Sequence, residues 1–402
     1  MQITTPPMGF NTWNTYGPNI SESMVLETAA AMKQNGLLDA GYKYIILDDG
    51  WSLKERDKSG HLVADPKKFP NGMKYLADTL HQMGFLFGIY SCCGYLTCGG
   101  YPGSYGHEWT DAADFAAWGV DYLKYDFCFR PDTEAPHTLY KRMGLALLNC
   151  GRKIVFAACS WGDEYTRQWV KETGADTWRS TGDIYDSWES VKFIATSQLS
   201  APEYQSGTCF NDMDMLVVDM HGNGNAGLTG CTESEYKTHF AFWAMMSSPL
   251  IIGCDVRKIS SEALALLKNA NLIKICQNSA FQPFFINMEK GVVNSCRKPD
   301  GPCFKNIEGS AFYNNLPTEY PVIAKILNNG EIAVGVFNFS DEELNQFKLA
   351  AMPATMGITA DNEYEFTDCF TGKKADLRCG VIFPESVAPH DCMVLIGKPV
   401  KR

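Results

Sequence analysis

The chain has 402 residues, of which 45% are hydrophobic and 20% are charged, as in an ordinary globular protein. This length favours one large domain and a smaller one. The formal net charge of -11 argues against partners that need a basic surface, namely nucleic acids and anionic membranes.

The first two thirds of the chain alternate short apolar runs with helical patterns. The clearest helical pattern covers residues 21–37, with apolar and small residues on one face, a serine cap and a stop at Gly36. The apolar runs predict eight strands, at "MGFNTW" (8–13), 42–49, 85–91, 121–128, 153–161, 176–180, 213–218 and 249–253. Eight strand–helix units predict a (β/α)8 barrel over residues 1–285. The rival fold, an open doubly wound sheet, would need a GxGxxG motif after the first strand.

From about residue 286 the pattern changes. Short alternating runs such as "GEIAVGVFNFSD" (330–341) are separated by "NNG" and "TGK" turns, and no helical period is convincing. We therefore predict an antiparallel β domain over residues 286–402.

Targeting signals and metal-binding patterns are missing from the sequence. No apolar run reaches about 18 residues, and "MQITTPPMGF" does not resemble a signal peptide, so we expect no membrane contact. The protein is expected to be cytoplasmic, or secreted if a leader was removed. The 15 cysteines are scattered rather than set in CxxC pairs, which favours buried thiols over zinc ligands.

Polar and aromatic residues gather at the predicted carboxyl ends of the barrel strands, where the active site of such a barrel lies. One stretch, "YLKYDFC" (122–128), places Lys124 and Asp126 on the same face of a buried strand, which a purely structural strand would not do. A single aspartate after a strand is more often a helix cap, but carboxylates follow several strands here. The positions are Trp13, Asp48, Asp49, Tyr90, Lys124, Asp126, Cys159, Trp161, Arg179, Asp183, Asp212 and Asp214.

This set of side chains suits glycoside hydrolysis, which uses two carboxylic acids and an apolar surface for the sugar ring. Metal-dependent hydrolysis would need HxH or HExxH, and the seven histidines are scattered. Serine hydrolysis would need GxSxG. We therefore predict no metal and no cofactor.

Six segments, in the same order along the chain, carry a family resemblance. They are "PPMGFNTWN" (6–14), "YIILDDGW" (44–51), "GIYS" followed by "CGGYPGSYGHE" (98–108), "WGVDYLKYDFC" (118–128), "WRSTGDIYDSW" (178–188) and "NDMDML" (211–216). Together they resemble glycoside hydrolase family 27, which comprises α-galactosidases (melibiases) and α-N-acetylgalactosaminidases. The resemblance implies a (β/α)8 barrel followed by a β-sandwich, and hydrolysis of terminal α-galactosides with retention of configuration.

The resemblance also implies roles for the catalytic residues. Asp126 corresponds to the nucleophile, and Asp183 to the acid/base that protonates the leaving oxygen and then activates water. Lys124, on the same strand face, would keep Asp126 ionised. Arg179 would bind near the 2-hydroxyl of the sugar. Asp186 is the weaker acid candidate and is expected to be a cap or a supporting group.

Galactose recognition is implied in the same way. Asp48 and Asp49 match the pair that hydrogen-bonds the 6- and 4-hydroxyls, which would select galactose over glucose. Cys98 and Cys128 match a disulfide beside the nucleophile. The full implied substrate-binding set is Trp13, Asp48, Asp49, Tyr90, Cys98, Lys124, Cys128, Cys159, Trp161, Arg179, Asp214 and Met215.

One segment departs from the animal enzymes of the family and leaves two substrates open. In "FAACSWGDEY" (156–165), Ser160 would suit an α-N-acetylgalactosaminidase, because a serine leaves room for the acetamido group. The segment resembles instead the C-x-W-G pattern of plant and microbial α-galactosidases, in which Cys159 and Trp161 would face the sugar. We favour the α-galactosidase, acting on small carbohydrates. An inactive barrel that only binds sugar is a distant alternative, because both Asp126 and Asp183 are present.

Overall fold

The structure is a computed structural model, and it divides into two compact units that are described separately below. The first unit is drawn from residues 1–187, 208–230 and 249–264, and the second from 188–207, 231–248 and 265–402. The predicted domain boundary at residue 286 stays a prediction. The residues that the structure describes are 3–200, 208–278, 283–289, 292–296, 319–345, 349–350, 363–378, 381–383 and 386–400.

The first unit is built on eight parallel strands, hydrogen-bonded in the order β10-β1-β2-β3-β4-β5-β6-β8. Listed along the chain, the strands are β1 (Met8–Asn11), β2 (Tyr44–Ile46), β3 (Leu86–Cys92), β4 (Tyr122–Asp126), β5 (Val155–Ala158), β6 (Thr177–Arg179), β8 (Phe210–Asp212) and β10 (Leu250–Ile252). A parallel bridge between Leu216 and Ile252 closes the sheet. At this bridge the Leu216 N–H donates to Ile251 O at 2.7 Å, and the Gly253 N–H donates to Leu216 O at 2.9 Å. The predicted barrel is therefore confirmed.

The seventh barrel strand lies earlier in the chain than predicted. The buried apolar run 213–218 was expected to form it, but β8 ends at Asp212, where Arg179 is its partner in β6. Asp214 has a φ of 74°, which interrupts the extended backbone. Beyond it, only Leu216 rejoins the sheet through its bridge. The prediction was wrong because burial alone does not distinguish a strand from a buried loop.

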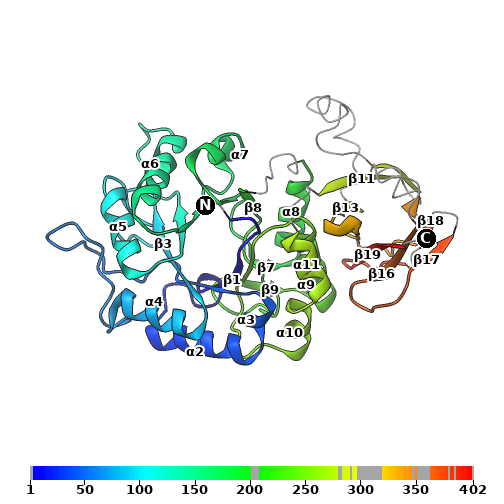
Figure 1. Ribbon diagram of the computed structural model, residues 1–402, viewed down its shortest axis with the longest axis horizontal. Coiled ribbons are helices and arrows are strands. Elements are labelled where there is room, and N and C mark those ends of the chain that lie inside the picture. Colours follow the sequence, from blue (N-terminus) through cyan, green and yellow to red (C-terminus); the bar gives the residue numbers. More distant parts are fainter. Residues whose placement is uncertain are drawn as a thin grey trace. The chain divides into compact units, whose positions relative to one another are not determined.

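Helices α2, α4, α5 and α6 lie outside the strands and contact one another in this order around the first unit (Figure 1). The α2 cap is as predicted, since the Ser21 hydroxyl accepts from the Met24 N–H at 3.3 Å. The helices outside the second unit are α1 (Trp13–Tyr16), α2 (Glu22–Gln34), α3 (Leu37–Ala40), α4 (Gly72–Met83), α5 (Glu108–Trp118), α6 (Pro136–Asn149) and α7 (Thr166–Trp169). Two short strands, β7 (Asp186–Ser187) and β9 (Gly227–Gly230), form a small parallel pair.

The second unit contains the predicted antiparallel β domain. Its six-stranded sheet has the order β12-β11-β13-β14-β19-β16, and a three-stranded sheet has the order β15-β18-β17. The strands are β11 (Phe284–Glu289), β12 (Val292–Cys296), β13 (Val322–Ile326), β14 (Ile332–Phe337), β15 (Leu349–Ala350), β16 (Glu363–Asp368), β17 (Asp376–Arg378), β18 (Val381–Phe383) and β19 (Cys392–Val400). The predicted "NNG" turn joins β13 to β14.

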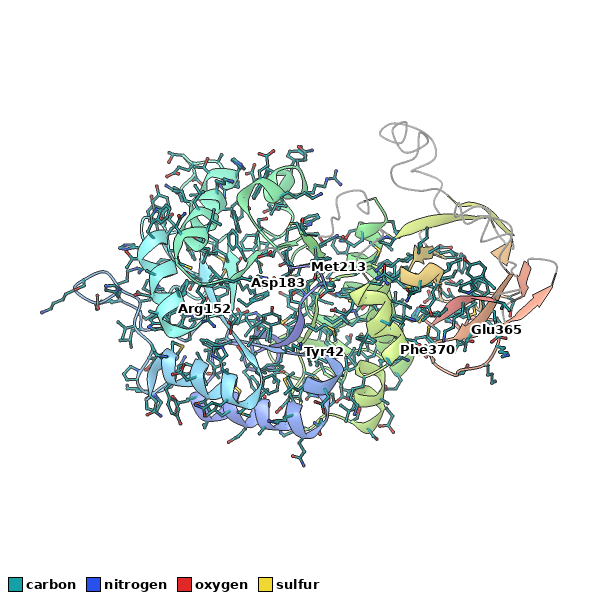
Figure 2. All side chains as sticks on the ribbon, in the orientation of Figure 1. Tyr42, Arg152, Asp183, Met213, Glu365 and Phe370 are labelled. Atoms are coloured by element: carbon teal, nitrogen blue, oxygen red, sulfur yellow. A yellow bond between two sulfur atoms is a disulfide. The ribbon has the colours of Figure 1, made fainter. Side chains whose placement is uncertain are left out.

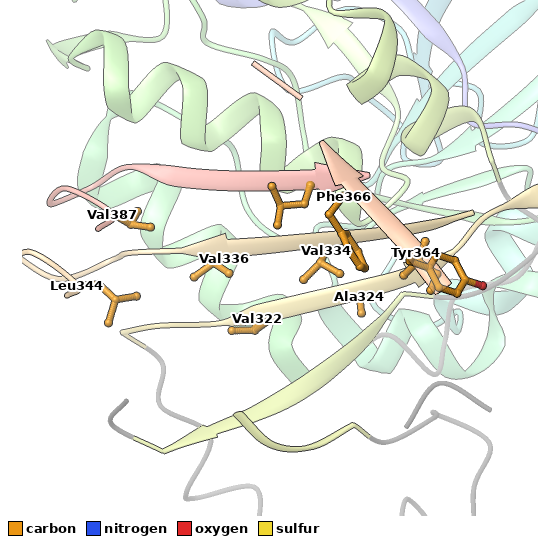
Figure 3. Close-up of a cluster of buried hydrophobic side chains, with 10 residues drawn as sticks. Val322, Ala324, Val334, Val336, Leu344, Tyr364, Phe366 and Val387 are labelled. Atoms are coloured by element: carbon orange, nitrogen blue, oxygen red, sulfur yellow. The ribbon is translucent and has the colours of Figure 1, made fainter. Parts of the chain in front are cut away.

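Alternation along these strands builds the core of the β domain. Val334 and Val336 on β14 point to the same face as Val322 on β13 and Phe366 on β16, and all four are buried (Figure 3).

The remaining helical elements are α8 (Trp188–Ser197), α9 (Glu233–Met245), α10 (Ser261–Leu267), α11 (Ala270–Gln277) and the short 3-10 turns η1 (Asp163–Tyr165), η2 (Val170–Thr173), η3 (Gln198–Ser200) and η6 (Asn328–Gly330). Within the described ranges, no helix combines the length and apolar character needed to cross a membrane.

Candidate active site

The two predicted catalytic aspartates and their neighbours come together at the carboxyl ends of the barrel strands. Parallel strands that close into a barrel bring all these ends to one mouth. Asp126 ends β4, Arg179 ends β6, and Asp183 lies on the loop after β6. Lys124, Cys159, Arg179, Asp214 and Met215 line one small cavity of about 20 Å³, which is room for about one water molecule.

Asp126 is buried and its carboxylate is held in a fixed orientation. The Tyr90 hydroxyl donates to Oδ2 at 2.9 Å, and the Phe127 N–H donates to Oδ1 at 2.8 Å. Burial raises the pKa of Asp126 to about 6, although Lys124 and these two hydrogen bonds oppose the shift. The carboxylate is therefore oriented for attack and is ionised above about pH 6.

Lys124 forms its ion pair with Asp48, and it also acts on Asp126 as predicted. Its Nζ donates to Asp48 Oδ2 at 2.7 Å and stands 5.4 Å from the centre of the Tyr90 ring. Burial favours the neutral amine, but attraction to Asp48, and to Asp126 more weakly, raises the pKa of Lys124 well above its usual value. The lysine stays charged, so it ties Asp48 in place and also favours the ionised form of Asp126.

Asp49 is held by main-chain and side-chain donors from a neighbouring loop. The Thr97 hydroxyl donates to Oδ1 at 3.0 Å and the Gly99 N–H donates to Oδ2 at 2.7 Å. Burial raises the pKa of Asp49, while these two bonds oppose the shift. A Cβ at residue 99 would lie 2.8 Å from Asp49 Oδ2, so a side chain there would displace the Asp49 carboxylate. Asn11 plays a similar part for Asp48, donating from Nδ2 to Oδ2 at 2.8 Å.

Three of these supporting residues, Asn11, Thr97 and Gly99, did not emerge as site residues from the sequence. The glycine-rich segment 98–106 was the available signal, because close approach of a backbone to a carboxylate requires residues without a side chain. Asn11 carried no signal, since its partner lies 37 positions away in the chain.

Arg179 joins two carboxylates. Its Nη2 donates to Asp183 Oδ1 at 2.8 Å and lies 2.6 Å from Asp214 Oδ2. Arg179 and Asp214 are buried, whereas the Asp183 side chain, labelled in Figure 2, is 56% exposed. The Ile184 N–H also donates to Asp214 Oδ2, at 2.7 Å. The arginine is thereby fixed beside the candidate acid/base.

The protonation of Asp183 depends on its cationic neighbours. Burial opposes its ionisation, but attraction by Arg179 and Lys124, together with the Arg179 hydrogen bond, lowers the pKa of Asp183 below its usual value. Solvent screens this ion pair because the Asp183 side chain is more than half exposed. Asp214, by contrast, is buried, and burial raises its pKa to about 6 despite attraction by Arg179. In the unliganded site Asp183 is therefore ionised.

The fifth strand presents its cysteine to the site and turns its serine away. Cys159 Sγ lies 3.8 Å from Arg179 Nη1. Burial raises the pKa of the Cys159 thiol, and the negative charges of Asp126 and Asp183 act in the same direction. Ser160 is buried on the other side, where its hydroxyl lies 2.6 Å from Thr166 Oγ1. This is the orientation expected for the C-x-W-G pattern, and it follows from strand alternation.

The remaining predicted residues surround this centre. Trp13 packs against the buried cluster that includes Met215, and the Trp161 ring lies 5.9 Å from the ring of Phe127. Cys98 and Cys128 form the disulfide that the resemblance implied, with Cα atoms 5.3 Å apart. Cys98 Sγ stands 3.8 Å from Asp126 Oδ2.

A larger cavity of about 460 Å³ lies elsewhere in the first unit. It is lined by residues before β5 and β6 and by α6, including Arg152, Lys153 and Asp176, and by none of the predicted site residues. Because it lies on the amino-terminal side of the strands, it does not belong to the candidate active site.

Comparison with known proteins places this geometry in a family. Residues 5–278 match the family model described as alpha galactosidase A, and this match covers more than half of the chain. The chain belongs to glycoside hydrolase family 27. A second model, the alpha galactosidase C-terminal beta sandwich domain, matches residues 318–396 of this family 27 enzyme.

Relatives of this family 27 enzyme are found among both sequences and structures. Alpha-galactosidase 2 of Arabidopsis thaliana is 45% identical over 275 residues, which cover 68% of this chain and 67% of that protein. The crystal structure of α-galactosidase I from Mortierella vinacea aligns with a TM-score of 0.81 at 30% identity, covering 98% of this chain and 97% of that one. The α-galactosidase of Saccharomyces cerevisiae, in a structure with raffinose, aligns with a TM-score of 0.80 at 28% identity, covering 99% and 98%.

Proposed function

We propose that this family 27 enzyme is a retaining exo-α-galactosidase that releases terminal α-galactose from small oligosaccharides or glycans. One observation carries the proposal: a buried, oriented carboxylate, Asp126, shares its surroundings with a solvent-facing carboxylate, Asp183, held by Arg179. Lys124 influences the pKa of both. The relatives named α-galactosidase, including the yeast enzyme bound to raffinose, support small galactosides as substrates.

The first chemical step forms a covalent intermediate. An oxygen of Asp126 attacks the anomeric carbon, the bond to the leaving oxygen breaks, and Asp183 gives its proton to that oxygen. The hydrogen bonds from Tyr90 and the Phe127 N–H hold the carboxylate in position, so little orientational freedom is lost in the transition state. The product of this step is galactosyl–Asp126.

The second step returns both carboxylates to their starting state. Asp183, now ionised, takes a proton from water, the water oxygen attacks the anomeric carbon, and the ester to Asp126 breaks. Two inversions give net retention. Because Arg179 lowers the pKa of Asp183 in the empty site, we propose that the 2-hydroxyl of bound galactose takes over part of the Arg179 contact. Asp183 is then easier to protonate when substrate is bound.

Recognition of galactose would fall to Asp48 and Asp49, which the surrounding donors hold at the inner end of the site. Glucose differs at the 4-hydroxyl and would leave a buried carboxylate without its partner, which is costly. Cys159 lies beside Arg179, and Ser160 is directed at Thr166. This arrangement supports a site of the size of galactose, in which Ser160 does not make room for an acetamido group.

The choice between galactose and N-acetylgalactosamine is tested directly with two nitrophenyl sugars. We expect kcat/KM for the α-galactoside to exceed that for the α-N-acetylgalactosaminide by at least about 100-fold, because the acetamido group would clash with the buried Cys159 side chain. Release of nitrophenolate measures both. A higher kcat/KM for the N-acetyl sugar would overturn the substrate assignment and leave the chemistry of the two aspartates standing.

A pH profile tests the protonation of Asp126. In an Asp183→Asn variant assayed with a dinitrophenyl α-galactoside, no acid is needed, so only the ionisation of Asp126 controls the first step. Its raised pKa means that the reactive carboxylate forms as the pH increases through about 6. We expect kcat/KM to rise with pH and level off, with its midpoint at about 6. A midpoint near the ordinary aspartate pKa of about 3.9, or a flat profile, would contradict the burial of this carboxylate in the working enzyme.

A further inference from the structure

Two cysteines and the candidate nucleophile form a cluster of metal-ligand atoms. The sulfur atoms of Cys98 and Cys128 and a carboxylate oxygen of Asp126 all lie within 4.8 Å of one another. Among the residues that the structure describes, this is the one group of three such side chains with the spacing to hold a metal ion. The proposed mechanism uses only Asp126 from this cluster and gives the two sulfur atoms no chemical role.

The spacing of these atoms suits one tetrahedral metal ion. In zinc sites the metal lies about 2.3 Å from a thiolate sulfur and about 2.1 Å from a carboxylate oxygen, so these two ligand atoms lie about 3.6 Å apart. Cys98 Sγ stands 3.8 Å from Asp126 Oδ2. Two thiolates and one carboxylate supply three ligands, and water can take the fourth position. Soft ions such as zinc and cadmium bind well to thiolate-rich sites of this kind.

The Cys98–Cys128 disulfide decides whether these ligands are available. A disulfide withholds both sulfur atoms, because the metal-binding form of cysteine is the thiolate. Reduction by a dithiol breaks the sulfur–sulfur bond, adds one electron and one proton to each sulfur, and converts the dithiol to its own disulfide. Cys98 is exposed, so a reductant can reach its sulfur. A metal ion then binds the two sulfur atoms and displaces their protons to solvent.

Contacts elsewhere hold the cluster together without the disulfide. On the side of Cys98, the N–H of the next residue, Gly99, donates to Asp49 Oδ2 at 2.7 Å. On the side of Cys128, the backbone carbonyl accepts from the buried Cys92 thiol at 3.1 Å. Neither contact depends on the sulfur–sulfur bond. The reduced cysteines therefore keep their places next to the nucleophile.

We propose that Cys98, Cys128 and Asp126 form a redox-dependent inhibitory site for a soft divalent metal ion such as zinc. In the oxidised enzyme the disulfide withholds both sulfur ligands, and Asp126 is free to attack the sugar. In the reduced enzyme the ion binds both thiolates and occupies the Asp126 carboxylate, so the glycosyl intermediate cannot form. The inhibition rests on the proposed function, because it blocks the proposed nucleophile, whereas binding of the ion rests on the cluster alone.

The test measures zinc inhibition in both redox states. The enzyme is reduced with a phosphine, which takes the oxygen of one water molecule while the two sulfur atoms gain its protons, and the phosphine is then removed. We expect zinc chloride at about 10 µM to lower kcat/KM of the reduced enzyme for a nitrophenyl α-galactoside by at least about tenfold, and that of the oxidised enzyme by less than about twofold. A chelator should restore the activity. Equal inhibition of the two states would overturn the proposal.

Cadmium gives a readout that does not depend on activity, because cadmium bound to thiolates absorbs in the ultraviolet. We expect this absorption in the reduced wild type and in reduced Asp126→Asn, which keeps both thiols, but not in the oxidised protein. Cys98→Ser and Cys128→Ser each lack one thiolate and should bind cadmium at least about tenfold more weakly. Both should also escape zinc inhibition, each judged against its own zinc-free activity.

Cys150→Ser is the control for other thiols. Among the cysteines whose side chains the structure describes, Cys150 is the one free cysteine that is not buried, and its thiol donates to Leu147 O at 3.1 Å at the end of α6. This variant should keep the zinc inhibition and the cadmium absorption of the reduced wild type. Zinc inhibition that survives in Cys98→Ser and Cys128→Ser, or reduction without any cadmium absorption, would overturn the site. An oxidised wild type that hydrolyses no α-galactoside, but shows cadmium absorption on reduction, would overturn the proposed function alone.

Discussion

Replacing Asp126 with asparagine is expected to lower kcat by at least about 10⁴-fold while galactose still binds, because a carboxamide cannot form the glycosyl intermediate. Asparagine keeps the shape of the side chain, and its carbonyl can still accept from Tyr90 or the Phe127 N–H. Burial already disfavours the Asp126 charge, as its raised pKa shows, so loss of that charge should not unfold the protein. The measurements are kcat on a nitrophenyl α-galactoside, calorimetric binding of galactose and Tm.

Asp176→Asn supplies the control for this experiment. Asp176 is also a buried aspartate of the barrel unit, and it accepts a hydrogen bond from the Phe156 N–H at 3.0 Å. It lies just before β6, on the side of the strands away from the candidate site, so its variant should keep most of the wild-type kcat. Near-normal turnover by Asp126→Asn would show that another residue is the nucleophile. Failure of both variants alike would indicate a general loss of folding.

Replacing Asp183 with asparagine should produce a loss that depends on the leaving group. With melibiose, whose leaving alkoxide needs a proton, we expect kcat/KM to fall by about 10² to 10⁴-fold. With a dinitrophenyl α-galactoside the first step needs no acid, so the fall in kcat/KM should be much smaller. The second step still lacks its base, so galactosyl–Asp126 should accumulate and can be observed by mass spectrometry of the intact protein.

Azide provides an independent test of the same role. Azide needs no base, so it should attack the anomeric carbon of the accumulated galactosyl–Asp126, break the ester and release α-galactosyl azide. Turnover of the dinitrophenyl substrate by Asp183→Asn should rise with azide concentration. Asp186→Asn is the matched control: Asp186 accepts from the Gly222 N–H at 2.6 Å and should show neither the leaving-group dependence nor the azide effect. An equal loss on both substrates by Asp183→Asn would count against its acid role.

Much of the candidate site could be predicted because its information is local in the sequence. A lysine and an aspartate two positions apart on an apolar strand must share a face, and carboxylates after successive parallel strands must meet at one mouth. The barrel, and Asp126 and Asp183 as candidate site residues, were accessible in this way, whereas the catalytic roles of the two aspartates come from the family resemblance. Hydrophobic patterning was less reliable for the seventh strand, where a buried loop at 213–218 has the same composition as a strand.

Partners across the fold could not be predicted from the sequence. Lys124 binds Asp48 rather than its strand neighbour Asp126, and Arg179 joins Asp183 to Asp214. Two of these three pairs, Lys124–Asp48 and Arg179–Asp214, connect different strands or loops, and which oxygen lies nearest to a cation depends on strand register and loop path. The protonation of each carboxylate depends on these same contacts.

The sequence by itself determined the order of strands and helices, the alternation that turns Cys159 and Ser160 to opposite sides, and the charged residues available at the strand ends, because all of these follow from short-range periodicity. Only the tertiary structure decided which side faces the site, which carboxylate each cation binds, and how the loops after β4 and β5 are joined through Arg130 and Glu164. These depend on burial and on distances between residues far apart in the chain, which periodicity does not encode.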